Sequence, residues 1–228
     1  MATPSDNIAP SAEPEPRLID GPAAAPATLL LAHGAGAPMD SPFLATITSG
    51  LAERGWRVVR FAFPYMARAR AGGRRGAPDR LPKGLGAFRE QVALEADSSS
   101  LVLAGKSLGG RVATLLLEET AAAGTVRAGL CFGYPFHPPG KPDSLRTAHL
   151  ETLSVPTLIV QGERDSFGRR AEVEGYALAP AIRLAWIPGG DHSLRPTRAA
   201  GLDEAAALDL AVEHADAFLR ERVGGRAP

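Results

Sequence analysis

Short, largely apolar runs recur along the chain and alternate with segments of helical periodicity. Continuous runs of this kind are typical of strands buried on both faces of a parallel sheet. The helical segments carry apolar residues three or four positions apart, as a helix packed on a sheet requires. The alternation predicts an α/β fold, a doubly wound, mostly parallel sheet with helices on both faces. The predicted strands are 28–32, 57–61, 101–105, 128–132, 157–160 and 183–187, and the predicted helices 43–54, 85–96, 110–123 and 203–222.

The length and composition fit one folded unit. The chain has 228 residues, of which 45% are hydrophobic and 22% charged, so a single core can be well buried. We expect residues 17–223 to form one domain, preceded by a disordered tail at 1–16 and followed by a frayed end at 224–228. Two stretches interrupt the alternation and are expected to be irregular: the arginine-rich and glycine-rich 66–83 and the proline-rich 133–142.

The charge balance and cysteine content narrow the classes of partner. The 25 Lys and Arg residues match the 25 Asp and Glu residues, so no net field favours nucleic acid or a membrane surface. The first residues lack the pattern of a secretory signal, and no stretch approaches the roughly 20 apolar residues that span a bilayer. The single cysteine, Cys131, is expected to be a core thiol, and no Cys/His spacing resembles a zinc site. We therefore expect a cytoplasmic protein.

The segment Gly105-Lys106-Ser107-Leu108-Gly109 matches the pattern G-x-S-x-G and lies between an apolar strand and a helix. That context defines a nucleophile elbow, a tight turn that exposes a serine hydroxyl at the carboxyl edge of a sheet. Glycines flank the serine because larger side chains would collide with the neighbouring backbone. A phosphate-binding P-loop is the alternative, but its first glycine would fall on Ser100. The motif predicts Ser107 as a nucleophile.

A serine hydroxyl needs a histidine base and an acid that orients it, and this motif sets the chain order Ser, acid, His. Asp165 and His192 follow two different predicted strands in that order, so both belong to the same edge of the sheet as Ser107. Asp191 is the rival acid, but a residue can seldom orient the ring of its own neighbour. We expect Asp191 to brace its loop, and His33 to pack beneath the glycine loop.

Further residues are assigned by their position beside this edge. The backbone amide of Leu108 is expected to form an oxyanion hole with an amide from His33-Gly34-Ala35-Gly36, and Ala35 is the chosen second donor. Loops near a site often contact its ligand, so substrate contacts are also assigned to Arg68 in the basic loop. The same expectation applies in the proline-rich stretch to Tyr134, Phe136 and His137.

From residue 27 to 222 the chain resembles the α/β-hydrolase superfamily through HGAG, GKSLGG, GERD and GGDHS. More narrowly, it is similar to small predicted hydrolases distantly related to dienelactone hydrolases, which share GYPFHPPGKP and PTLIVQGERDSFG. The resemblance implies triad roles for Ser107, Asp165 and His192. Some eukaryotic relatives serve as subunits of protein complexes. Only about 25 residues separate two of the predicted strands, too few for a folded cap domain.

These observations predict a hydrolase that cleaves a carboxylic ester or thioester through an acyl-enzyme intermediate. The expected partner is a small-molecule ester or thioester, with no metal and no organic cofactor, no nucleic acid and no membrane; the oligomeric state is not predicted. The alternative is a noncatalytic hydrolase-like module that binds a ligand or assembles a complex. The identity of the substrate stays open.

Overall fold

The computed structural model describes residues 17–74, 76–98 and 100–223. The predictions for 1–16 and 224–228 lie outside these residues. The strands are β1 (Arg17–Asp20), β2 (Thr28–Ala32), β3 (Arg57–Phe61), β4 (Leu101–Lys106), β5 (Val126–Phe132), β6 (Thr157–Gly162) and β7 (Ile182–Ile187). The α-helices are α1 (Pro42–Glu53), α2 (Pro64–Arg70), α3 (Leu81–Leu94), α4 (Leu108–Ala122), α5 (Arg170–Val173) and α6 (Glu204–Arg222).

The strands form one sheet in the order β1-β3-β2-β4-β5-β6-β7. All neighbours from β3 to β7 are parallel, and β1 pairs antiparallel with β3 at the edge. The predicted α/β fold is confirmed. After β3 the chain crosses β2 to form β4, so the order reverses between β2 and β4. Such a switch point leaves a crevice at the carboxyl ends of the two strands, where α/β proteins bind ligands.

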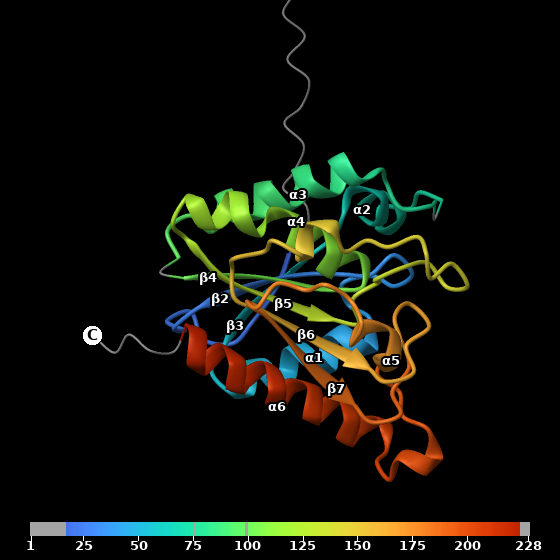
Figure 1. Ribbon diagram of the computed structural model, residues 1–228. Helices are drawn as coiled ribbons and strands as arrows, with labels where there is room; N and C mark the ends of the chain where they lie inside the picture. Colours follow the sequence, from blue (N-terminus) through green and yellow to red (C-terminus); the bar gives the residue numbers. More distant parts are fainter. Residues whose placement is uncertain (1–16, 75, 99, 224–228) are drawn as a thin grey trace, which may run out of the picture.

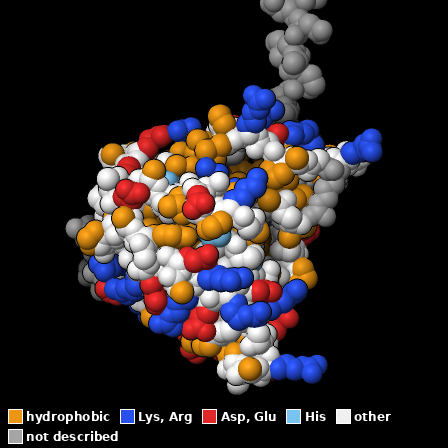
Figure 2. Space-filling model, turned by 45° about the vertical axis from the view of Figure 1, so that its right-hand side comes forward, with side chains coloured by type: hydrophobic (Ala, Val, Ile, Leu, Met, Phe, Trp, Pro, Cys, Tyr) orange, Lys and Arg blue, Asp and Glu red, His pale blue; other side chains and the backbone are white. Residues whose placement is uncertain are grey.

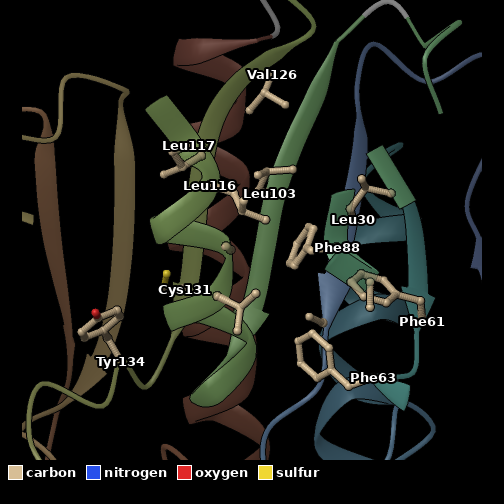
Figure 3. Close-up of a cluster of buried hydrophobic side chains, with 14 of the residues drawn as sticks. Leu30, Phe61, Phe63, Phe88, Leu103, Leu116, Leu117, Val126, Cys131 and Tyr134 are labelled. Atoms are coloured by element: carbon tan, nitrogen blue, oxygen red, sulfur yellow. The ribbon is translucent and has the colours of Figure 1, made fainter. Parts of the chain in front are cut away.

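Helices cover both faces of the sheet (Figure 1). Helices α2, α3 and α4 lie on one face, and α1 and α6 pack together on the other. Apolar side chains fill both interfaces, and Figure 3 shows part of the layer beneath α3 and α4, which includes Phe61, Phe88, Leu103 and Leu116. Cys131 is fully buried in this layer, as expected of a core thiol. Its burial raises the pKa of the thiol far above the ordinary value.

The six predicted strands are all present, each with ends within two residues of its predicted range. Strand β1 was missed, because at the sheet edge Arg17, Leu18 and Asp20 are half-buried and Ile19 is exposed, so the segment forms no buried apolar run. The chain between β5 and β6 holds only a short 3₁₀ turn, Ala148–Leu150, so no cap domain lies there. Over the part of the chain that the structure describes, no helix has the length and apolar character needed to cross a membrane.

The prediction of an irregular stretch at 66–83 was wrong at both ends. Pro64 begins α2, and its fixed φ angle suits the first helical position. Tyr65, Met66 and Ala67 then bury one face of that helix against the core, which outweighs the neighbouring glycines and arginines. Helix α3 likewise starts at Leu81, with Pro82 in its first turn.

Candidate active site

The turn between β4 and α4 holds Ser107 in a strained backbone conformation, with φ 51° and ψ −112°. Non-glycine residues rarely adopt such angles, which cost on the order of 1–3 kcal/mol and occur mainly at functional sites. Among the described non-glycine residues, the other positive φ belongs to Leu194 (63°), two residues after His192. The turns that carry Ser107 and His192 are therefore both held in unusual backbone geometry.

Gly105 makes the turn after β4 possible. A Cβ atom there would lie 2.1 Å from the carbonyl carbon of Gly109 and 2.3 Å from the amide nitrogen of Gly110, inside the backbone of α4. We expect Gly105→Ala to lower the free energy of unfolding by at least about 2 kcal/mol, because backbone must shift to admit the methyl group. Gly86→Ala is the matched control: its Cβ would meet open space within α3, so a gain of roughly 0.5–1 kcal/mol is expected. Urea denaturation measures both, and equal stabilities would contradict the close approach.

Two backbone segments frame the hydroxyl of Ser107. Leu108 begins α4, so its amide is among those with no acceptor inside the helix, at the positive end of the helix dipole. Across the switch point lies loop 34–37, where a Cβ on Gly34 would sit 3.6 Å from the Cβ of Ser107. His33 is fully buried and shapes this loop: its Nδ1–H donates to Gly34 O (2.7 Å) and its Nε2 accepts from Phe63 N–H (3.0 Å).

A continuous chain of hydrogen bonds joins the serine to a buried carboxylate. Ser107 Oγ lies 2.8 Å from His192 Nε2, and His192 Nδ1 lies 2.8 Å from Asp165 Oδ2. A carboxylate accepts but does not donate, so Nδ1 carries the proton and Nε2 is free to accept the hydroxyl proton. Asp165 follows β6, His192 follows β7 and Ser107 follows β4. The sheet thus brings the three residues together at one edge.

A cavity of about 580 Å³ opens beside Ser107 and His192, within the range of roughly 300–1,000 Å³ usual for small-molecule sites. It is lined by loop 34–37, the start of α1, the first turns of α6 and the residues Lys106, Ser107, Phe167, His192, Ser193 and Arg195. The carboxyl edge of the sheet comes forward in Figure 2, which shows hydrophobic side chains gathered over the upper part of this face and charges of both signs below.

Comparison with known proteins shows the family and the fold of the chain. Residues 25–220 match the alpha/beta hydrolase domain family. The chain belongs to that family. Solved structures with the same fold include dienelactone hydrolase from Anabaena variabilis, 20% identical with a TM-score of 0.65 over 91% of each chain. Est1E from Butyrivibrio proteoclasticus, solved with ferulic acid bound, is 17% identical with a TM-score of 0.65 over 92% of this chain and 95% of the other. The esterase domain of a Rhodothermus marinus protein is 17% identical, TM-score 0.64, over 90% and 92%.

In this alpha/beta hydrolase domain, two further residues, Gln161 and Phe167, hold the Asp165–His192 pair in place, and neither was predicted from the sequence. Asp165 is fully buried and accepts hydrogen bonds from Gln161 Nε2 at Oδ2 (2.8 Å) and from the Phe167 amide at Oδ1 (2.8 Å). The Phe167 ring stacks on His192, with centroids 4.1 Å apart. A glutamine in an otherwise apolar strand could have identified the first support, whereas nothing in the sequence indicates the stacking.

The proline-rich stretch 133–142 of the hydrolase domain forms hydrogen bonds to the two residues that hold the Asp165 carboxylate. Gln161 also accepts from the Tyr134 amide (2.7 Å), and the His137 amide donates to Phe167 O (3.1 Å). Tyr134 and Phe136 are fully buried, and His137 is 3% exposed. None of these three lines the cavity beside Ser107, contrary to the expectation that they contact substrate. The aromatic rings of Tyr134 and Phe136 pack against each other in the apolar core, where their burial stabilises the loop next to Asp165.

Some of the other predicted site residues line the cavity beside His192, and others lie outside it. Ala35 and Ser107 line it. Arg68 does not line it, and its guanidinium pairs with Asp79 (2.9 Å), which lines a separate hollow of about 120 Å³ next to Leu108. Asp191 accepts through Oδ1 from the amides of Ser193 (2.7 Å) and Arg195 (3.0 Å), as expected of a brace. Within the described ranges, no cluster of three or more His, Cys, Asp or Glu side chains could hold a metal ion.

Burial controls the charge of His192. Desolvation lowers its pKa below the ordinary value of 6.5, and the nearby ammonium group of Lys106 acts in the same direction. The hydrogen bond to Asp165 and the charges of Asp165 and Asp191 oppose this shift. The net result keeps the imidazole neutral at pH 7, the form that accepts a proton.

Proposed function

We propose that the chain is a serine hydrolase that cleaves a carboxylic ester or thioester through an acyl-enzyme, with Ser107 as nucleophile, His192 as base and Asp165 as acid. One observation carries this proposal: an unbroken chain of hydrogen bonds runs from a buried carboxylate through a neutral imidazole to a strained serine that faces a cavity. The family and the fold shared with esterases and dienelactone hydrolase support it.

In the first half of the reaction, Ser107 Oγ attacks the carbonyl carbon of the substrate while His192 Nε2 takes its proton. The carbonyl oxygen becomes an oxyanion, which the amides of Leu108 and Ala35 are proposed to bind. Asp165 stabilises the imidazolium. When the tetrahedral intermediate collapses, the carbon–oxygen or carbon–sulfur bond to the leaving group breaks, and the imidazolium returns the proton to that group.

In the second half, water replaces the leaving group. His192 Nε2 takes a proton from the water as the water oxygen attacks the acyl carbon, and the same amides hold the oxyanion. Collapse breaks the bond to Ser107 Oγ, which regains its proton from the imidazolium. The products are a carboxylic acid and a free serine, so every proton removed is returned and no oxidant or reductant is consumed.

Labelling by a fluorophosphonate tests this proposal, because such a probe reacts quickly only with a serine that has a working base and oxyanion site. The labelling rate is expected to fall as the pH drops through the pKa of His192, since the protonated imidazole cannot accept the proton of Ser107. Burial places that pKa below 6.5, so the rate at pH 6.5 should exceed half of its maximum. The measurement is the rate of label incorporation between pH 4.5 and 9.

Ser107→Ala is the blank for this experiment. A midpoint above pH 6.5 would contradict the lowered pKa, and a rate independent of pH would exclude a histidine base. A folded wild-type protein that takes up no label at any pH would instead favour the noncatalytic binding module.

A further inference from the structure

We propose that Lys106 selects the substrate: its ammonium group binds a carboxylate on the molecule being hydrolysed, so the preferred substrates are esters or thioesters that carry a second, anionic group. This inference rests on the proposed function, which it extends from a reaction to a substrate class. The expectation that the basic loop supplies this contact is set aside, since Arg68 and Arg70 are paired with Asp79 and Asp40 and neither lines the cavity.

Lys106 is the last residue of β4, directly before Ser107, and its side chain forms part of the cavity wall. The ammonium nitrogen lies 5.4 Å from the centroid of the Phe43 ring on α1 and donates to the backbone carbonyl of His192. It also approaches Gly133, where a Cβ atom would lie 2.9 Å away. Gly133 has a φ of +65°, so the turn after β5 leaves room for the ammonium group.

This ammonium group has no ionic partner within the part of the chain that the structure describes. No carboxylate oxygen there lies within 4.0 Å of Lys106 Nζ, and its one hydrogen-bond acceptor is the neutral carbonyl of His192. The nearby carboxylates act only at longer range, because Asp165 is held by His192 and Gln161, and Asp191 by backbone amides. An ammonium has three donors, so two are available to a ligand.

The other charges of the cavity wall do not compete for an anion. Arg195 lies at the exposed rim, where its side chain is 63% exposed and paired with Glu204 at 3.0 Å. Phe43, Leu44, Phe167 and Leu208 supply apolar walls. A cation that lacks a counter-ion in such surroundings is costly to bury, and a substrate carboxylate would offset that cost more strongly there than in water.

The charge state of Lys106 gives the proposal a pH signature. Desolvation lowers the pKa of Lys106 to about 8, opposed by the charges of Asp165 and Asp191. The ammonium is therefore still the main form at pH 7 and is lost as the pH rises through about 8. His192 is neutral in this range, and the hydrogen bond to Glu204 raises the pKa of Arg195 above its ordinary value, so Arg195 keeps its charge. A preference for anionic substrates should therefore weaken above pH 8, whereas hydrolysis of neutral esters should not.

The alternative role for Lys106 is structural, because its bond to the His192 carbonyl could simply anchor the loop that carries the base. The two roles are separated by matched substrates and matched variants. The substrates are monomethyl esters of straight-chain dicarboxylic acids from succinate to suberate, each compared with the ester whose distal carboxylate is replaced by a carboxamide. These pairs have nearly the same size and differ in charge.

The variants are Lys106→Gln, which keeps a donor but no charge, and Lys106→Arg, which keeps the charge. Arg89→Gln removes one positive charge from α3, where Arg89 pairs with Glu119 outside the cavity. The readout is the ratio of kcat/KM for each carboxylate ester to that for its carboxamide partner. For at least one chain length, wild type should favour the carboxylate, and Lys106→Gln should reduce the ratio by about 10- to 100-fold, mainly through KM. Lys106→Arg should retain most of the ratio, and Arg89→Gln all of it.

Equal losses on both members of every pair would overturn the proposal and assign Lys106 to loop anchoring, as would a wild-type ratio near one at all chain lengths. Binding to the Ser107→Ala protein separates this inference from the proposed function, because it needs no turnover. Monomethyl glutarate should bind at least about tenfold more weakly after Lys106→Gln is added. If Lys106→Gln leaves this binding unchanged, the carboxylate site is refuted even if the wild type hydrolyses esters. If Lys106→Gln weakens the binding but the wild type hydrolyses none of the esters, the site is supported and the hydrolase is refuted.

Discussion

Ser107→Ala is expected to slow ester hydrolysis by at least about 1,000-fold in kcat while leaving the fold intact. The nucleophile is lost, yet the strain of the turn resides in the backbone, where Ser107 has φ 51°. An alanine adds no new contact at that position. Steady-state kinetics on the best ester of the panel measure the rate, and the thermal midpoint reports the fold.

Ser49→Ala is the matched control for this substitution, because it removes a hydroxyl from α1 that bonds Glu53 and lies outside the cavity. It should hydrolyse esters like the wild type. If Ser107→Ala retained more than about a tenth of the wild-type rate, Ser107 would not be the nucleophile.

Asp165→Asn should be nearly as severe, with a loss on the order of 10⁴-fold in kcat. Three donors converge on this carboxylate: the Phe167 amide at Oδ1, and both Gln161 Nε2 and His192 Nδ1 at Oδ2. An asparagine offers one oxygen, so at least one buried N–H group would face the new NH₂ group. If that group is on the imidazole, His192 adopts the tautomer whose Nε2 carries a proton and cannot act as the base.

Asp191→Asn is the control, because the donors to Asp191 use one carboxylate oxygen, whereas the donors to Asp165 use both. The amides of Ser193 and Arg195 both donate to one oxygen, Oδ1, which the asparagine carbonyl replaces without loss. We expect a change in kcat of less than about tenfold, compared by the same assay. If Asp191→Asn were the more damaging substitution, the acid of the proposed triad would have to be moved to Asp191.

The sequence predicts the parts of this molecule that depend on local patterns. Five of the six predicted strands lie in the interior of a covered sheet and so require an apolar run, and β7 at the edge is found because its residues Ile182–Ile187 are still mostly apolar. The elbow is found because only glycine tolerates the approach of α4 to Gly105. Strand β1 and helix α2 escape prediction. Strand β1 lies at an exposed edge, and α2 is only seven residues long, with Tyr65, Met66 and Ala67 as its buried residues.

Residues around the candidate site were harder to place, because side-chain roles depend on contacts between distant segments. The sequence places Tyr134, Phe136 and His137 correctly in a proline-rich loop, but it cannot tell whether such a loop faces solvent, ligand or core. The loop faces the core because the Gln161 side-chain amide forms hydrogen bonds with both the Tyr134 backbone and Asp165. That bridge joins residues 27 positions apart, which no local spacing rule describes.

One wall of the cavity is also part of the core. Leu208 of α6 lines the cavity beside Ser107, belongs to the apolar cluster with Leu44 and Ile47 of α1, and borders a second hollow of about 340 Å³ between the two helices. Enlarging the cavity at this leucine would loosen the contact between α1 and α6, so a change of substrate range would carry a loss of stability. Thr46 and Ser193 line the same cavity outside that cluster. Variation in acyl preference among relatives, or in a directed-evolution library, should therefore accumulate at positions such as these while position 208 stays apolar and large.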